Sequence, residues 1–294
     1  MIKKSLFRLA SFFLHLISLL PFWLLYVFAD ILFVILYYLT AYRRKVTQSN
    51  LKNAFPEKSE SERNLIERKY YRFLADNILE SIKMKSMSAD DIRKRCKVHN
   101  PEEVNKHLDN GKAVLLATGH YANWEWGNLI IALTFPEKLF VIYKPLSNKN
   151  FDTFINKMRA KFGAVMVPMR LTLRKIVELK SEKYLFGFAS DQTPTRHESQ
   201  YFTTFLNQPT AVFLGLEKIA KTTNNPVVFT HINRLKRGYY EYTFTTLVEH
   251  PKLTAEHEIT NLHTQKLEQI IKQKPELWLW SHRRWKFRPE DISK

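Results

Sequence analysis

Residues 111–129 read GKAVLLATGHYANWEWGNL, and this stretch decides the fold. Val114 to Ala117 form a short apolar run, which is typical of a buried strand. Thr118-Gly119 follows the run and marks a turn. Asn123 then stands where its side chain can cap a helix. The stretch therefore predicts a strand, a turn and a helix in close succession.

The same stretch carries a candidate general base, His120, followed five positions later by Glu125 in the first turn of the predicted helix. The histidine can take a proton, while the carboxylate fixes its tautomer and stabilises the imidazolium. The spacing alone is weak, because 10 histidines and 28 acidic residues supply such a pair by chance, and His263 with Glu268 shares it. His263 lies within an expected helix, residues 255–272, and we expect it on a solvated face. The strand–turn–helix setting favours His120 and Glu125.

The composition indicates a basic protein with a substantial core. Of its 294 residues 45% are hydrophobic, the formal net charge is +18 and the sequence pI is near 9.8. Such a surface favours an anionic partner, which could be nucleic acid, anionic lipid or an acidic protein. The single cysteine, Cys96, excludes an internal disulfide framework and fits a reducing compartment. We expect Cys96 to be structural.

The amino-terminal region is far more apolar than the rest. Between Leu9 and Ala41 the only formal charge is Asp30, and Phe22 to Ala41 would span ~30 Å as a helix, the thickness of a bilayer core. The apolar stretch is too long for a signal peptide, and basic residues flank both of its ends. We therefore expect residues 1–42 to be a membrane anchor, spanning or re-entrant, and residues 43–294 to be the catalytic domain. A buried core helix is the alternative.

Beyond the anchor, strand and helix patterns alternate, which predicts an α/β fold with a mostly parallel central sheet flanked by helices. Strands are expected at residues 114–117, 140–143, 165–167, 184–189, 226–231 and 240–247. Helices are expected at residues 46–55, 59–85, 88–95, 101–108, 148–162, 171–180, 210–222 and 255–272. In open α/β sheets, ligands bind at the carboxyl ends of the strands.

Two more strand exits carry polar residues. Asp191-Gln192 follows the strand at 184–189 and could hydrogen-bond a hydroxylated substrate, or could form an ordinary capped loop. Lys144 follows the strand at 140–143 and could meet a phosphate or a developing oxyanion, or could be a solvated lysine.

The carboxyl end reads PELWLWSHRRWKFR over residues 275–288. Three tryptophans and four cations fall within this short stretch. The aromatic rings could stack on nucleic-acid bases. They could equally close the core while the cations meet lipid phosphate.

Taken together, these motifs resemble the late (secondary) acyltransferases of lipid A biosynthesis, within the lysophospholipid acyltransferase superfamily. Relatives that acylate phosphatidylinositol mannosides are also similar. The resemblance covers nearly the whole chain and rests on five elements. These are the apolar anchor, the box from His120 to Glu125, the element Tyr143-Lys144-Pro145, Asp191-Gln192 with the phenylalanine-rich loop up to Ala211, and the carboxyl end from Pro275 to Pro289.

The resemblance implies a glycerolipid-acyltransferase-like fold and transfer of a fatty acyl chain from a thioester, usually of acyl carrier protein, to a hydroxyl of an anionic membrane glycolipid such as a lipid A precursor. His120 would act as general base, oriented by Glu125, without a covalent acyl-enzyme, a metal or a cofactor. The oxyanion would meet Lys144 or backbone N–H groups near Asn123. The implied substrate-binding residues are Asn123, Lys144, Arg159, Asp191, Gln192, Arg283 and Arg284. The implied location is the cell inner membrane, with the catalytic domain on the cytoplasmic side.

Some residues depart from the family pattern. Glu125 stands where the superfamily more often has Asp, and Lys144 replaces an arginine and so loses bidentate phosphate binding. The acceptor therefore stays open among a lipid A precursor, a lysophospholipid, an aminolipid and a glycosyl-inositol lipid. A basic membrane-associated nucleic-acid-binding protein is the alternative of another class, although no nucleic-acid-binding motif is present. An α/β esterase is disfavoured because the sequence lacks Gly-x-Ser-x-Gly.

Overall fold

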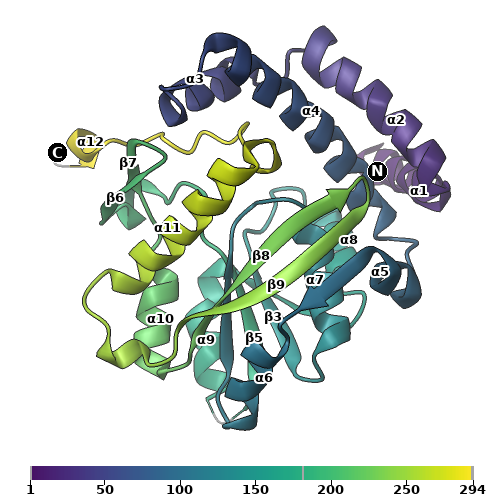
Figure 1. Ribbon diagram of the computed structural model, residues 1–294. Helices are drawn as coiled ribbons and strands as arrows, with labels where there is room; N and C mark the ends of the chain where they lie inside the picture. Colours follow the sequence, from purple (N-terminus) through teal and green to yellow (C-terminus); the bar gives the residue numbers. More distant parts are fainter. Residues whose placement is uncertain (1, 181, 293–294) are drawn as a thin grey trace.

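The computed structural model describes residues 2–180 and 182–292. Its main sheet has seven strands in the order β1-β9-β8-β2-β5-β3-β4 (Figure 1). All neighbouring pairs are parallel except β8 and β9. The strands are β1 (Cys96–His99), β2 (Val114–Thr118), β3 (Lys138–Tyr143), β4 (Val165–Pro168), β5 (Tyr184–Ala189), β8 (Val227–Lys236) and β9 (Tyr239–Val248). The prediction of an α/β fold with a mostly parallel sheet is confirmed.

Helices flank this sheet and continue beyond it toward both termini (Figure 1). They are α1 (Ile2–Leu19), α2 (Phe22–Val34), α3 (Arg44–Ala54), α4 (Glu60–Lys83), α5 (Ala89–Arg95), α6 (Glu102–Asp109), α7 (Trp124–Thr134), α8 (Lys149–Arg159), α9 (Thr172–Glu178), α10 (Gly215–Thr223), α11 (Glu258–Gln273) and α12 (Pro289–Ile292). The expected helix starts are set by capping residues. Ser59 caps α4 in a reciprocal box with Glu62, and Asn123 caps α7.

Strand β2 lies inside the sheet, between β5 and β8. Residues 114–117 are buried, because helices cover both faces of a parallel sheet and the strand must be apolar on both. In the register between β2 and β5, Thr118 is paired with Ala189, and in the register between β5 and β3, Gly187 is paired with Val141. The carboxyl ends of these three strands therefore open at the same edge of the sheet.

The structure differs from the sequence prediction around residue 210. A helix was expected from Thr210, but Thr210 belongs to a short hairpin of β6 (Phe202–Phe205) and β7 (Gln208–Ala211), and α10 begins at Gly215. The two residues of the hairpin turn, Leu206 and Asn207, both have positive φ, at 49° and 62°. Two successive residues with positive φ are the signature of a type I′ turn, which matches the twist of paired strands.

Cys96 begins β1, a strand that we did not predict, at the edge of the sheet. Its thiol is buried, and burial raises the pKa of the Cys96 thiol well above its usual value. A buried, protonated thiol is unreactive, as expected for a structural cysteine.

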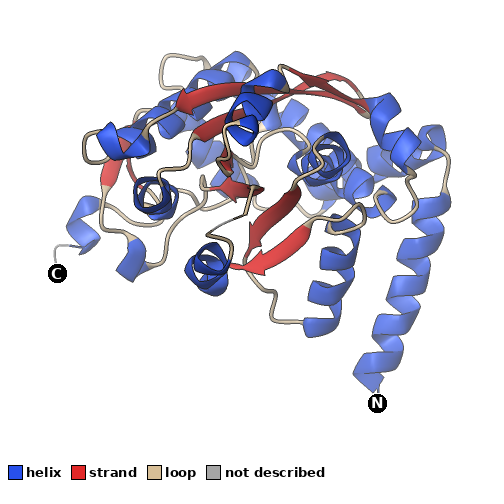
Figure 2. Cartoon of the chain, turned by 90° about the horizontal axis from the view of Figure 1, so that it is seen from below, coloured by secondary structure: helices blue, strands red, loops and turns tan. Residues whose placement is uncertain are grey.

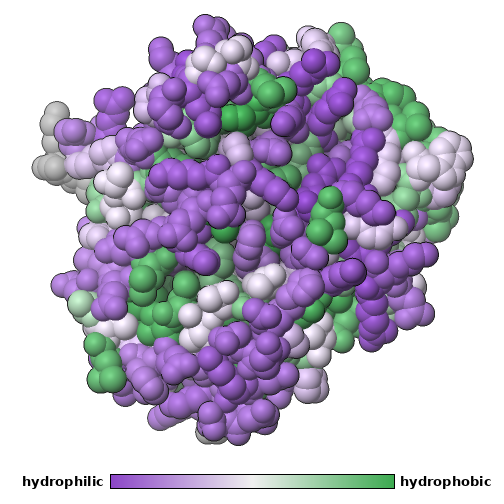
Figure 3. All heavy atoms as spheres, in the orientation of Figure 1, coloured by the Kyte–Doolittle hydropathy of each residue, from purple (hydrophilic) through white to green (hydrophobic). Residues whose placement is uncertain are grey.

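The amino-terminal helices form an apolar edge of the molecule. Helix α2 buries Leu25, Ala29 and Phe33 at intervals of four, and it packs along α4. Its other face stays exposed and mostly apolar, over the edge of the molecule where α1 and α2 lie (Figure 3). Trp23 on this face is 69% exposed. Residues Phe22–Leu39 are long and apolar enough to cross a membrane, and only 22% of this window is buried. A mostly exposed apolar helix fits a membrane anchor better than a core helix.

Candidate active site

His120 sits on a tightly fixed loop between β2 and α7. A side chain at Gly119 would place its Cβ 2.7 Å from Cδ1 of Leu267 and 3.1 Å from Oδ2 of Asp191, so the buried Leu267 side chain would have to move to admit it. Ala122 has a φ of +49°, in the left-handed region, and its N–H donates to the Leu277 carbonyl at 2.8 Å. The carboxyl-terminal segment thus holds the loop in a conformation that it would otherwise avoid.

The carboxylate that binds His120 is that of Asp191. Nδ1 of His120 lies 2.6 Å from Oδ1 of Asp191, and the backbone N–H of His120 donates to Oδ2 at 2.8 Å. The indole N–H of Trp278 donates to the same Oδ2 at 2.8 Å. Burial alone would raise the pKa of Asp191, but the His120 charge and these three hydrogen bonds outweigh it and hold that pKa well below its usual value. An ionised Asp191 keeps the proton of His120 on Nδ1 and leaves Nε2 as an acceptor.

The strand register explains this pairing. His120 and Asp191 each lie two residues past Thr118 and Ala189, which are paired across β2 and β5. The two exits are therefore adjacent even though 71 residues separate His120 from Asp191.

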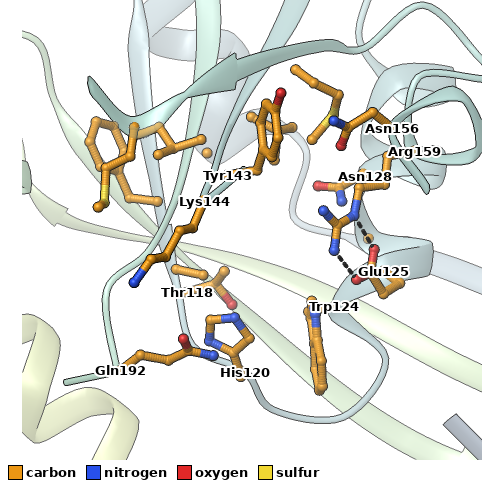
Figure 4. A pocket seen from close by; sticks show the side chains of 18 of the residues that line it. Thr118, His120, Trp124, Glu125, Asn128, Tyr143, Lys144, Asn156, Arg159 and Gln192 are labelled. Atoms are coloured by element: carbon orange, nitrogen blue, oxygen red, sulfur yellow. Dashed lines mark hydrogen bonds and ion pairs between the residues drawn. The ribbon is translucent and has the colours of Figure 1, made fainter. Parts of the chain in front are cut away.

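The expected pairing of His120 with Glu125 is replaced by another contact. Glu125, in the first turn of α7, points toward α8 and binds Arg159 through two parallel hydrogen bonds (Figure 4). The bond from Nε of Arg159 to Oε2 of Glu125 measures 2.7 Å. Both side chains are largely buried, at 11% exposed for Glu125 and 22% for Arg159, so this bidentate pair is well shielded from water. Each side chain satisfies the hydrogen-bonding groups of the other, so the Glu125 carboxylate pairs with Arg159 and not with His120.

A cavity of about 550 Å³ opens beside His120. In Figure 4 the His120 ring, the Gln192 amide and the Lys144 side chain lie on one side of the cavity, and the Glu125–Arg159 pair lies on the other. The remaining wall is mostly apolar and includes Leu116, Ile131, Leu139, Val141, Met166, Phe188 and Ile232. A polar rim above an apolar wall suits a long hydrophobic chain with one reactive polar end.

The other sequence-predicted residues lie outside the cavity wall. Asn123 is fully buried: its Oδ1 accepts from the Trp126 N–H at 2.9 Å, and its Nδ2 donates to Glu80 at 2.7 Å. The carbonyls of Arg283 and Arg284 each accept from the Thr193 hydroxyl at 2.8 Å. These three residues hold the walls of the site in place.

Arg284 is a buried cation next to the dyad. Its side chain is 3% exposed and lies 6.0 Å from the Phe205 ring, and burial lowers its pKa to about 10. The negative charge of Asp191 acts in the opposite direction and raises that pKa. Arg284 therefore affects the site in two ways: its positive charge interacts with the charge of Asp191, and its backbone carbonyl accepts a hydrogen bond from Thr193.

The tryptophans of the carboxyl end are part of the core. Trp278 and Trp280 are 1% and 0% exposed and pack edge to face at 4.8 Å. Trp285 donates from its indole N–H to the Thr210 hydroxyl at 2.7 Å. Trp278 and Trp280 are buried and Trp285 is half-buried against the core, so the aromatic residues that suggested nucleic-acid binding have another explanation.

Sequence reasoning placed His263 on a solvated helix face, and this was wrong. His263 is buried, and its Nε2–H donates to the Thr118 carbonyl at 3.0 Å, at the exit of β2. Desolvation lowers the pKa of His263, which keeps the ring neutral. The apolar residues of α11 at positions 259, 267, 270 and 271 share a face with position 263, so their spacing could have shown the burial.

A histidine–carboxylate dyad at two strand exits, beside a long apolar cavity, defines the class of the protein as an α/β enzyme that acts on a hydrophobic substrate. A family model described as "Bacterial lipid A biosynthesis acyltransferase" matches residues 1–287, and the chain belongs to this family. It is therefore a membrane-associated acyltransferase of lipid A biosynthesis.

Three relatives with names of the same family support the assignment. The lipid A biosynthesis acyltransferase of Haemophilus influenzae is 24% identical over 85% of this chain and 79% of its own length. The lipid A biosynthesis palmitoleoyltransferase of Escherichia coli K12 is 24% identical over 84% of this chain and 80% of its own length. The lipid A biosynthesis lauroyltransferase of Escherichia coli K12 is 22% identical over 85% and 81%.

Proposed function

We propose that the protein transfers a fatty acyl chain from an acyl carrier protein thioester to a hydroxyl of a lipid A precursor, with His120 and Asp191 as the catalytic dyad. The observation that best supports the proposal is the fixed orientation of the His120 imidazole. Nδ1 of His120 is held at 2.6 Å by a buried carboxylate, while the rest of the ring lines the cavity. This geometry directs Nε2 at a substrate hydroxyl.

The chemical steps follow from this geometry. Nε2 of His120 takes the proton of the acceptor hydroxyl as its oxygen attacks the thioester carbonyl carbon. The C–O bond forms and the carbonyl becomes an oxyanion, which the Lys144 ammonium at the cavity rim can stabilise. The C–S bond then breaks, and the imidazolium returns its proton to the leaving thiolate. Asp191 balances the positive charge of the imidazolium throughout.

The apolar and the polar parts of the cavity lining have different roles in this proposal. The apolar wall takes the acyl chain, and the Glu125–Arg159 pair on one side and Gln192 on the other bind the polar part of the acceptor. Arg159 is fixed by Glu125, so its guanidinium is already oriented when a phosphate or sugar hydroxyl arrives. Glu125 is thus a positioning residue for Arg159.

The charge of +18 supports an acidic donor protein and an anionic acceptor. The exposed apolar face of α2 supports attachment to the cell inner membrane through residues 1–42. A donor made in the cytoplasm places the catalytic domain, residues 43–294, on the cytoplasmic side.

The test is a transfer assay with purified full-length protein, acyl carrier protein thioesters and four acceptors: a lipid A precursor, a lysophospholipid, an aminolipid and a glycosyl-inositol lipid. We expect acylation of the lipid A precursor, and His120→Ala should lower turnover by at least about 10²-fold. His250→Ala is the matched control, because His250 is exposed. A folded His120→Ala protein with near-normal turnover would refute the mechanism, and preference for another acceptor would refute the assigned substrate.

A further inference from the structure

The entrance of the cavity carries apolar side chains that face water. Residues 144–151, named here the mouth segment, connect β3 to the first turn of α8, and each of them is exposed. Leu146 is 44% exposed and Phe151 is 39% exposed. Residues 143–147 also line the cavity. A large apolar pair beside the opening of a site is a feature of surfaces that bind another apolar surface.

The mouth segment is held in one orientation by its own hydrogen bonds. Oδ1 of Asp152 accepts from the Leu146 N–H at 2.8 Å. Oδ1 of Asn148 accepts from the N–H groups of Asn150 and Phe151 at 3.1 and 3.2 Å. The Leu146 and Phe151 side chains therefore project from an ordered backbone, and little conformational entropy is lost when they bind.

Cations surround this apolar pair. Lys149 and Lys157 are exposed on α8, and the ammonium of Lys85 lies 5.2 Å from the Phe154 ring, on which Phe151 stacks. The one acidic side chain of α8, Asp152, is used by the hydrogen bond to the mouth segment. Exposed apolar residues with lysines beside them are the pattern that binds the surface of an anionic bilayer.

The mouth segment also belongs to the same face as the amino-terminal helix. Lys83, at the end of α4, donates to the Ser18 carbonyl of α1 at 2.8 Å, and Lys161, just past α8, donates to the Lys85 carbonyl at 3.0 Å. The end of α4 thus joins α1 to α8, and both helices extend from the body on one side (Figure 2). Helix α1 exposes Leu9, Phe12, Phe13, Leu16 and Leu19.

We propose that the mouth segment is a second membrane contact, which inserts Leu146 and Phe151 into the leaflet that the amino-terminal helices occupy. Lys149 and Lys157 then lie at the level of anionic headgroups, and the cavity opens at the bilayer surface. The consequence for catalysis rests on the proposed function: a lipid acceptor reaches His120 without leaving its leaflet. The membrane contact itself does not depend on turnover.

The experiment uses full-length protein with one introduced cysteine, Leu146→Cys or Phe151→Cys, carrying the fluorophore NBD. The natural Cys96 is 3% exposed and stays unlabelled in the folded protein. The control is Leu253→Cys, because Leu253 is 84% exposed and follows the end of β9 that is remote from α2. The other end of the β8–β9 hairpin binds α2, through Arg237 and Asp30. The labelled proteins are reconstituted into vesicles of phosphatidylcholine with or without phosphatidylglycerol.

We expect NBD at 146 and 151 to shift to the blue and to resist reduction by dithionite, more strongly when phosphatidylglycerol is present. The label at 253 should be reduced quickly in both vesicles. Equal, fast reduction at all three positions of vesicle-bound protein would overturn the proposal. A blue shift caused by acyl carrier protein without vesicles would also overturn it, because the segment would then be a protein-docking site.

A turnover measurement separates this proposal from the proposed function. Replacing Phe151, which is not among the residues that line the cavity, by serine should raise the apparent KM for a vesicle-borne acceptor by about tenfold and leave the rate in detergent micelles unchanged. His120→Ala should lose activity in both media. Absence of acyl transfer by the unmodified protein would refute the function while the NBD result still decides the membrane contact.

Discussion

Replacing Asp191 by asparagine tests the dyad most directly. Asp191 accepts three hydrogen bonds, one at Oδ1 from Nδ1 of His120 and two at Oδ2 from the His120 N–H and the Trp278 indole. An asparagine amide has one oxygen, and it satisfies more donors if that oxygen takes the place of Oδ2. The amide NH₂ then faces Nδ1 of His120, which must accept, and the imidazole proton moves to Nε2. The ring would present a donor to the substrate hydroxyl and could not act as a base.

The expected loss of turnover has two causes, the wrong tautomer of His120 and the missing negative charge at position 191. We expect turnover to fall by about 10²- to 10⁴-fold, the range of general-base terms and of tautomer errors in histidine–carboxylate pairs. Binding of substrate should change little, because Asp191 is buried behind His120.

The same substitution should change the pH dependence of stability. Folding lowers the pKa of Asp191, so the ionised carboxylate stabilises the folded protein above the ordinary pKa of an aspartate. This stability is lost as the pH falls through the pKa of Asp191 in the folded protein. The asparagine variant should lose that part of the acid sensitivity.

The assay is steady-state acyl transfer together with a thermal melt and the ¹⁵N chemical shifts of the His120 ring. Asp90→Asn is the matched control, because the Asp90 side chain is 95% exposed. A folded Asp191→Asn protein with normal turnover, or a wild-type His120 that carries its proton on Nε2, would show that the dyad is not the base.

Three further predictions concern the rest of the site. Glu125→Gln should raise the KM for the acceptor more than it lowers kcat, because Glu125 contacts Arg159 and not His120. The double variant with Arg159→Gln should be little worse than either single variant, and strictly additive losses would contradict the coupling of the two residues. Gly187→Leu should shorten the acyl chain of the product, as measured by mass spectrometry, because Gly187 lines the cavity and a Cβ at this position would meet its nearest atoms only at 3.7 Å or more. Gly187→Ala is the milder control, and a product with an unchanged acyl chain would place that chain elsewhere. The apparent second-order rate with acyl carrier protein thioesters should fall as salt rises toward ~0.5 M, where screening is strong, and a rate independent of salt would favour a small thioester donor.

The parts of the fold that depend on local sequence could be predicted. The apolar run at 114–117, the cap at Ser59 and the cap at Asn123 each act over a few residues, and each appears in the structure. The β6–β7 hairpin was missed because its turn, Leu206-Asn207, lacks the glycine that usually marks a type I′ turn.

The partner of His120 depends on the order of the strands, which local sequence does not encode. β5 lies next to β2, although β3 and β4 come between them in the chain. The exit at Asp191 was noted as polar, but only the register of β2 with β5 brings it to His120. Trp278 was recognised only as part of an aromatic, basic end, since nothing near it in sequence points to Asp191.

The contacts of Leu277 and Trp278 with the His120 loop have a consequence for biosynthesis. The apolar helices α1 and α2 precede the catalytic residues in the chain, so they can reach the membrane before those residues have been made. The loop gains its Leu277 contact, and Asp191 its third donor, only after residues 277 and 278 have been translated. The apolar helices are therefore available to the membrane before the His120 loop is held in place, and a chain that stalls before Leu277 would lack the contact that holds this loop.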